Sequence, residues 1–192
     1  MQGIKRLGVM GGTFDPIHVA HLALAEAARE RFALDRILFV VSANPPHKPG
    51  SRLTPAEQRL EMVRLAIADN PAFEACDLEL RRDKPSYTAD TLLELKALYP
   101  GAEKYLIVGI DEAQILHRWH DYETVLRECT VAAAWRPGYP QEDPRLPAVL
   151  FHAPEMNISS SGIRTRLAEG GSVRYLVPGS VCEYIKDKGL YV

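Results

Sequence analysis

The segment from Gly11 to His21, GGTFDPIHVAH, combines residue types that suit a phosphate-binding site. Its two glycines end a short apolar run, Leu7 to Met10, and glycine lets a backbone approach a ligand closely because it has no Cβ. The helix that follows should begin near His18, and the first turn of a helix presents unpaired N–H groups with a partial positive charge. His18 and His21 add two donors on one helical face. We therefore expect this segment to bind the phosphates of a nucleoside triphosphate.

The spacing excludes the two commonest phosphate loops. A G-x-G-x-x-G fingerprint fails because Met10 stands two residues after Gly8, and no G-x-x-x-x-G-K-[ST] sequence occurs. An ordinary strand-to-helix turn remains an alternative, since glycine and Asp-Pro form turns in many proteins. Zinc is a second alternative, but it needs a third ligand beside the two histidines. Cys76, Cys129 and Cys182 stand singly, without a C-x-x-C pair.

A second segment with anion-binding character, NISSSGIR, runs from Asn157 to Arg164. Serines before a helical run are good N-caps, and an ordinary cap is one interpretation. Arg164 would lie beside the positive end of the same helix, where it could hold a polyphosphate with charge-assisted hydrogen bonds. The two segments, about 140 residues apart in sequence, together favour a phosphate site.

Composition limits the class of protein. The 192 residues fit one domain, residues 1–192, and 23 basic against 25 acidic side chains give a net charge of −2. This balance favours neither nucleic acid nor an anionic membrane as a partner. We expect no signal peptide before the first strand, and no apolar run has the length of a membrane span. Three unpatterned cysteines indicate a reducing compartment, so we expect a cytoplasmic protein.

Apolar runs alternate with helical patterns along the chain. This alternation predicts an α/β fold with a doubly wound, mostly parallel sheet and helices on both faces. Ligands bind such sheets at the carboxyl ends of the strands, where the first glycine loop and the Asn44–Lys48 loop should meet. The predicted strands are Arg6–Met10, Arg36–Val41, Phe73–Cys76, Tyr105–Val108, Val131–Trp135 and Ala148–Phe151. The predicted helices are His18–Phe32, Pro55–Ala68, Ala89–Leu98, Asp111–His117, Tyr122–Arg127, Gly162–Glu169 and Ser180–Lys186.

GGTFDPIHVAH and ISSSGIR resemble the two signatures of the nucleotidyltransferases with an H-x-G-H type motif. Further motifs resemble the bacterial nicotinate-nucleotide adenylyltransferases, and the likeness runs from about Leu7 to Val192. One departure is Ala20, which replaces the usual glycine between the histidines; alanine adds one methyl group and favours a helix. The motifs that carry this likeness are PPHK at 45–48, SYT at 86–88, DTL at 90–92, GID at 109–111, Trp119, RPG at 136–138 and the C-terminal YI…GLY.

The resemblance implies a Rossmann-like fold of the nucleotidyltransferase type and transfer of AMP from ATP to nicotinate mononucleotide. The products would be nicotinate adenine dinucleotide and pyrophosphate. The acceptor phosphate is already a nucleophile at neutral pH, so catalysis should consist of positioning and charge neutralisation. We expect the histidines to donate to phosphate as imidazolium in the bound state. Mg²⁺ should enter with ATP, held mainly by phosphate oxygens and water rather than by a dedicated protein site.

Site residues follow from the resemblance, position by position. On the ATP side, the C-terminal segment from about residue 158 to 192 would complete the site, and His18, His21 and Arg164 would be the catalytic residues. The other ATP-binding residues would be the backbone of Gly11, Gly12, Thr13 and Phe14, the helix start at Ser159 and Ser160, Asp111 at the sugar, and Arg136 at the adenylate. On the acceptor side, Trp119 would stack on the pyridine ring, Thr88 would meet its carboxylate or phosphate, and His47 and Lys48 would meet the phosphate.

Other interpretations stay open at this point. The same chemistry could act on nicotinamide mononucleotide or pantetheine phosphate, and a nucleotide-sensing protein without catalysis is a further alternative. Trp119 alone could serve in the core, and Asp111 could simply cap a helix. The sequence also leaves open whether the chain forms a homo-oligomer.

Overall fold

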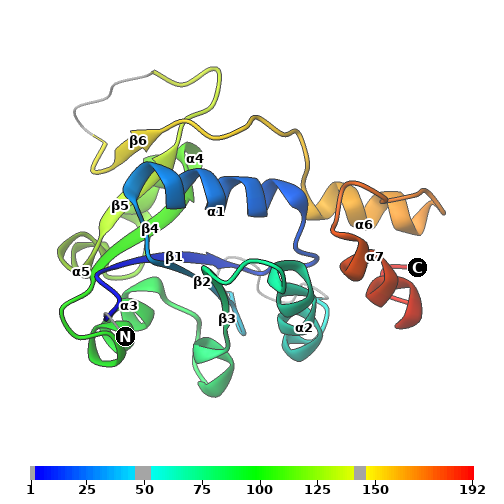
Figure 1. The fold of residues 1–192 in the computed structure, drawn as a ribbon, viewed down its shortest axis with the longest axis horizontal. Coiled ribbons are helices and arrows are strands. Elements are labelled where there is room, and N and C mark those ends of the chain that lie inside the picture. Colours follow the sequence, from blue (N-terminus) through cyan, green and yellow to red (C-terminus); the bar gives the residue numbers. More distant parts are fainter. Residues whose placement is uncertain (1–2, 46–52, 141–145) are drawn as a thin grey trace.

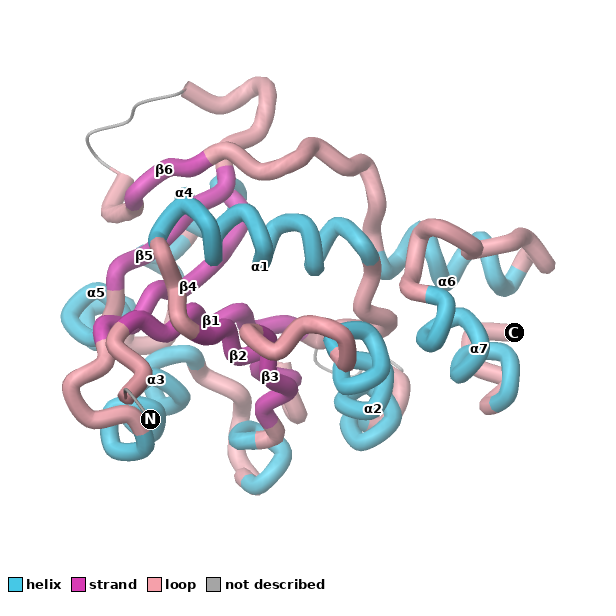
Figure 2. Tube along the Cα trace, in the orientation of Figure 1, coloured by secondary structure: helices cyan, strands magenta, loops and turns pink. Residues whose placement is uncertain are grey.

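Six parallel strands form one sheet in the computed structural model, which describes residues 3–45, 53–140 and 146–192. The strand order is β3-β2-β1-β4-β5-β6, and every pairing is parallel (Figures 1 and 2). The predicted sheet is therefore confirmed, and within the described residues it is parallel throughout rather than mostly so. The strands are β1 (Arg6–Gly12), β2 (Arg36–Val41), β3 (Phe73–Cys76), β4 (Glu103–Gly109), β5 (Thr130–Ala134) and β6 (Val149–Phe151).

The helices agree with the predicted ones apart from one break and one addition. The predicted helix at 111–117 divides into α4 (Ile110–Gln114) and a 3₁₀ turn, η2 (Leu116–Arg118), and a second 3₁₀ turn, η1 (Leu78–Arg81), was not expected. None of the helices in the described ranges has the length and apolar character needed to cross a bilayer. The remaining helices are α1 (Val19–Phe32), α2 (Ala56–Ile67), α3 (Thr88–Leu98), α5 (Tyr122–Glu128), α6 (Ser160–Ala168) and α7 (Gly179–Asp187).

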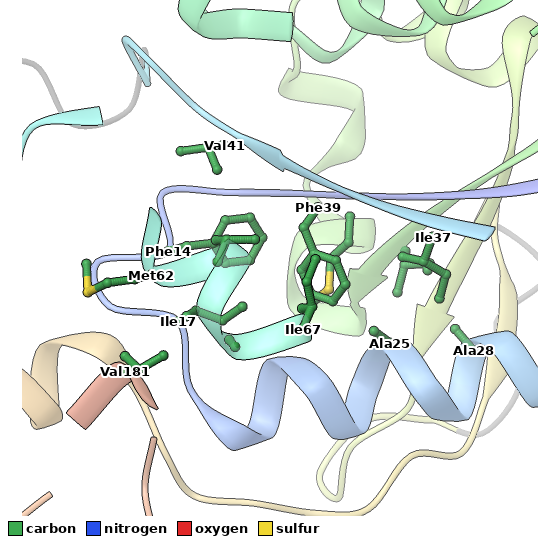
Figure 3. Packing of buried hydrophobic residues seen from close by; sticks show 14 of the residues in the cluster. Phe14, Ile17, Ala25, Ala28, Ile37, Phe39, Val41, Met62, Ile67 and Val181 are labelled. Carbon is green, nitrogen blue, oxygen red and sulfur yellow. The ribbon is translucent and has the colours of Figure 1, made fainter. Parts of the chain in front are cut away.

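Each face of the sheet carries its own apolar core. Alternate side chains of a strand point to opposite faces, so Ile37 and Phe39 of β2 enter one cluster while Leu38 and Val40 enter the other. The first cluster includes side chains of α1, α2, α6 and α7, and the second includes side chains of α3 and α5. Figure 3 shows part of the first cluster. Helices thus cover both faces, as the alternating sequence pattern predicts.

The strand order has a switch point beside β1. β1 lies between β2 and β4, so the chain winds outward in opposite directions on its two sides. In parallel sheets of this kind, ligands bind outside the carboxyl ends of the strands at that switch point. Gly12 and Gly109, the last residues of β1 and β4, border it. The fold therefore brings the first glycine segment and the GID segment to one edge.

The second core offers a test of this packing. Leu92 of α3 is fully buried, whereas its neighbour Leu93 is 43% exposed. Leu92→Ala should lower the free energy of unfolding by about 2–5 kcal/mol, because it removes buried methyl groups and leaves a cavity. Leu93→Ala, the control, should cost less than about 1 kcal/mol. Urea unfolding measures both, and equal losses would contradict the assignment of Leu92 to the core.

Candidate functional site

The turn between β1 and α1 is fixed in the core by Phe14. The Phe14 side chain is 2% exposed and packs against Phe39 of β2, with ring centroids 5.8 Å apart (Figure 3). Gly12 fits beneath it, since a Cβ there would lie 3.0 Å from the Phe14 ring. Any contact of Phe14 with a ligand must therefore come from its backbone, which has a φ of +47°.

The two histidines of the first segment lie face to face. Their rings stack with centroids 3.6 Å apart and 15° between planes, and the Phe14 ring meets His21 edge-on with centroids 5.2 Å apart. His18 has extended backbone and is the N-cap of α1, one residue before the first residue of the helix. It is 5% exposed, and its Nδ1 atom is buried without a hydrogen-bond partner among the described residues. The His18 imidazole is thus enclosed at the N-terminus of α1.

Burial keeps both imidazoles neutral. It lowers the pKa of His18 to about 4, and burial together with the neighbouring His18 lowers the pKa of His21 to about 3. The backbone N–H of His18 donates to Nδ1 of His21 at 3.3 Å. In a neutral ring this contact places the hydrogen on Nε2, so neutral His21 already offers a donor. The imidazolium expected in the bound state requires phosphate charge to outweigh this burial.

Hydrogen bonds join the two sequence segments. Nη1 of Arg164 donates to the carbonyl oxygen of Asp15 at 2.7 Å. The Ser160 hydroxyl donates to the carbonyl oxygen of Pro16 at 2.9 Å. Ser159 is the N-cap of α6 and accepts from the Gly162 N–H at 3.1 Å, as a capping serine should. The helix begins at Ser160, two residues earlier than predicted, so Arg164 lies one turn into α6 rather than in its first turn.

Two side chains from elsewhere in the chain, Arg59 and Tyr191, support the turn, and the sequence interpretation gave neither of them a role there. Arg59 of α2 is 1% exposed and donates to the carbonyl oxygens of Thr13 at 2.6 Å and Thr54 at 2.8 Å. Buried Asp15 accepts a hydrogen bond of 2.6 Å from the hydroxyl of Tyr191. Arg59 was detectable, because it occupies the apolar face of α2, four residues before Val63.

Asp111 and Arg136 meet across the ends of β4 and β5. Nη1 of Arg136 lies 3.8 Å from Oδ1 of Asp111, and both side chains are about half exposed. Asp111 comes two residues after Gly109, and a Cβ at position 109 would collide with the Asp111 carboxylate. The pair is therefore accessible at the switch-point edge, on the opposite side of β1 from β2.

The chain neighbours of Thr88 and Trp119 are in contact near the start of α3. The Ser86 hydroxyl accepts from the N–H groups of Ala43 and Asn44 at 3.1 and 3.2 Å, which ties this region to the loop after β2. Tyr87 stacks on His120 with centroids 4.1 Å apart, and so brings the N-terminal residue of α3, Thr88, toward Trp119.

Trp119 itself is half-buried and packs against the second core cluster. Its packing contacts are thus present in the structure, and its stacking role stays a prediction. The predicted acceptor residues His47 and Lys48 lie outside the described residues.

The described ranges contain no group of three or more His, Cys, Asp or Glu side chains placed to hold a metal ion. His18 and His21 therefore form a pair without a third ligand of these types among those residues. The ring that meets the pair edge-on belongs to Phe14 and offers no ligand atom.

Comparisons with known proteins place the chain in a family. A cytidylyltransferase-like family model matches residues 9–166. A Thermus thermophilus protein named probable nicotinate-nucleotide adenylyltransferase is 49% identical over 186 residues, which cover 97% of this chain and 99% of that protein. A Desulfitobacterium hafniense protein of the same name is 44% identical, with 97% and 96% covered. The chain belongs to the nicotinate-nucleotide adenylyltransferase family.

A solved structure agrees with the family fold. The Plasmodium falciparum nicotinic acid mononucleotide adenylyltransferase complexed with NaAD superposes with a TM-score of 0.78 at 22% identity, covering 97% of each chain. This structure confirms the Rossmann-like nucleotidyltransferase fold, and the relatives above confirm the resemblance and the enzyme class expected from the sequence. The residue roles stay predictions, and the geometry above is what supports them.

Burial of the two histidines should make stability depend on pH. An unfolded histidine has a pKa of about 6.5, so between roughly pH 6.5 and pH 4 the unfolded chain binds protons that the native chain does not. The free energy of unfolding should fall as the pH is lowered through this window, by up to about 1.4 kcal/mol per pH unit for each histidine. Urea unfolding at pH 7 and pH 5 measures the fall. It should be smaller in a His18→Gln/His21→Gln variant, and an unchanged fall would contradict neutral burial.

Proposed function

We propose that this enzyme transfers the adenylyl group of ATP to nicotinate mononucleotide. The acceptor's phosphate oxygen attacks the α-phosphorus, and the bond between the α-phosphorus and the oxygen that bridges the α- and β-phosphates breaks. Pyrophosphate leaves, and nicotinate adenine dinucleotide is the other product. The hydrogen bonds of Arg164 and Ser160 to the turn at Asp15–Pro16 carry the proposal, because they unite both signature segments beside the stacked histidines. Relatives of 42–49% identity bear the name of this activity.

The phosphate side of the proposal is electrostatic. Charge that builds on the leaving group would be met by His18, His21 and Arg164, and by the α6 N-terminus at Ser159 and Ser160. The backbone from Gly11 to Phe14 would line the nucleotide, with Asp111 and Arg136 at its sugar and adenylate parts. Donors fixed in advance in a poorly solvated site stabilise a transition state without reorganisation. Residues 158–192 would complete this half of the site.

The acceptor half of the proposal is supported by the closeness of the Thr88 and Trp119 segments. Thr88 is the first residue of α3. Its neighbour Tyr87 stacks on His120, which is the neighbour of Trp119. A helix start with a hydroxyl side chain suits a carboxylate or phosphate, and an indole suits a pyridine ring. His47 and Lys48 would add positive charge for the acceptor phosphate.

Mg²⁺ would enter with ATP. We expect the ion to be bound chiefly by phosphate oxygens and water. When bound, the ion neutralises charge on the polyphosphate. The protein's part is to position the two substrates in line.

An acceptor comparison tests the proposed reaction. Pyrophosphate release from ATP and Mg²⁺ is measured with nicotinate mononucleotide, nicotinamide mononucleotide and phosphopantetheine in parallel. The proposal predicts strong preference for the first. Preference for another acceptor would keep the ATP half and overturn the acceptor half, and no release with any acceptor would favour a nucleotide sensor.

The histidines provide a test of the phosphate half. His21→Ala should lower kcat by at least about a hundredfold, which is the scale for one lost transition-state donor. His18→Ala should do the same. The exposed His152, outside the proposed site, is the control, and His152→Ala should retain turnover. Near-normal kcat in both active-site variants would overturn the phosphate assignment.

Trp119 provides a test of the acceptor half. Trp119→Ala should raise the KM for nicotinate mononucleotide by about 5- to 150-fold, which corresponds to the loss of about 1–3 kcal/mol of stacking. The KM for ATP should stay unchanged. Trp119→Phe keeps an aromatic face and should recover most of the effect. An unchanged acceptor KM in Trp119→Ala would assign the residue to core packing alone.

A further inference from the structure

We propose that Tyr191 is a positioning residue for adenylyl transfer, whose hydroxyl group fixes Asp15 and thereby orients Arg164 toward the phosphates. This inference rests on the proposed function. It assigns a role to the C-terminal end of the chain, which contains no residue of either signature segment. The last residue, Val192, is exposed, whereas Tyr191 reaches back to the turn at the start of α1.

A reversal of the chain after α7 places Tyr191 beside the turn at Asp15–Pro16. After α7, the N–H of Leu190 donates to the carbonyl oxygen of Ile185 at 3.0 Å, and that of Gly189 donates to the carbonyl of Lys186 at 3.2 Å. Gly189 has a φ of +58°. These two bonds form a Schellman motif, in which a left-handed glycine ends the helix and reverses the chain. Leu190 packs against the same core cluster as Ile185, so the reversal is held by apolar contact as well.

The contact that Tyr191 makes is buried and directional. Its hydroxyl donates to Oδ1 of Asp15 at 2.6 Å, and Asp15 is 1% exposed. The other carboxylate oxygen accepts from the N–H of Thr54 at 3.4 Å. Burial and the hydrogen bond to Asp15 raise the pKa of the Tyr191 hydroxyl, so it remains protonated as a donor. Since a buried carboxylate is costly without partners, removal of this donor should displace Asp15.

A displacement of Asp15 would also shift Arg164, because Asp15 is hydrogen-bonded to both Tyr191 and Arg164. The side chain of Asp15 accepts from Tyr191 while its carbonyl oxygen accepts from Nη1 of Arg164 at 2.7 Å. The next carbonyl, that of Pro16, accepts from Ser160. The side-chain position of Asp15 and the direction of Arg164 are therefore coupled across a single peptide unit. Misplacement of a catalytic group by about 1 Å can reduce turnover about a hundredfold.

A double-mutant cycle tests the coupling. Tyr191→Phe keeps the ring and removes the hydroxyl, and it should lower kcat between about tenfold and a hundredfold with little change in the acceptor KM. In an Arg164→Ala background the same substitution should cause no further loss, because the residue through which it acts is absent. Tyr105→Phe, which removes a hydroxyl that donates to a Glu103 carboxylate oxygen at 3.3 Å on β4, is the matched control and should retain wild-type kcat.

Two results would overturn the proposal. Losses of equal size in the native and Arg164→Ala backgrounds would show that Tyr191 acts independently of Arg164. Wild-type kcat in Tyr191→Phe, with the thermal midpoint unchanged, would show that the hydroxyl has no positioning role. If the wild-type enzyme released no pyrophosphate with any acceptor, the proposed function would fail instead. The cycle would then be read from affinity for α,β-methylene ATP, where weakening by Tyr191→Phe only when Arg164 is present supports the coupling and equal weakening overturns it.

Discussion

The site depends on how three backbone carbonyl groups in one short turn are held. The carbonyls of Thr13, Asp15 and Pro16 accept hydrogen bonds from Arg59, Arg164 and Ser160, which come from α2 and α6. Each donor belongs to an element whose apolar face lies in the first core cluster. Core packing thus fixes the donors, the donors fix the turn, and the turn fixes the start of α1 with its two histidines. A phosphate site of this kind gains its effect from groups that are in place before the ligand arrives.

Burial of the histidines determines the protonation state of the site. Two stacked imidazoles in an apolar surrounding lose hydration, which lowers the pKa of each and leaves both neutral at physiological pH. Protein stability therefore favours the neutral pair, whereas bound phosphate would favour its charged form.

The sequence predicts the strands and most helices because their causes are local. Apolar runs and turn residues place β2 and β3 at their observed bounds, and helical periodicity places α1 and α5 within a residue. It does not predict the break between α4 and η2, since the apolar pattern runs on through Ile115 and Leu116. Nor does it give the position of Arg164 in α6, because three successive serines offer several N-caps and tertiary contacts select Ser159.

The contact between Tyr191 and Asp15 lies beyond such local reasoning. Tyr191 is 176 residues from Asp15, and no spacing rule pairs them. Co-crystallisation with α,β-methylene ATP and Mg²⁺ tests the account's central claim most directly. The account predicts the triphosphate within hydrogen-bond distance of His18, His21 and Arg164, beside the N-terminus of α6. Phosphates bound elsewhere along the sheet edge, with the histidine pair still stacked and unliganded, would contradict it.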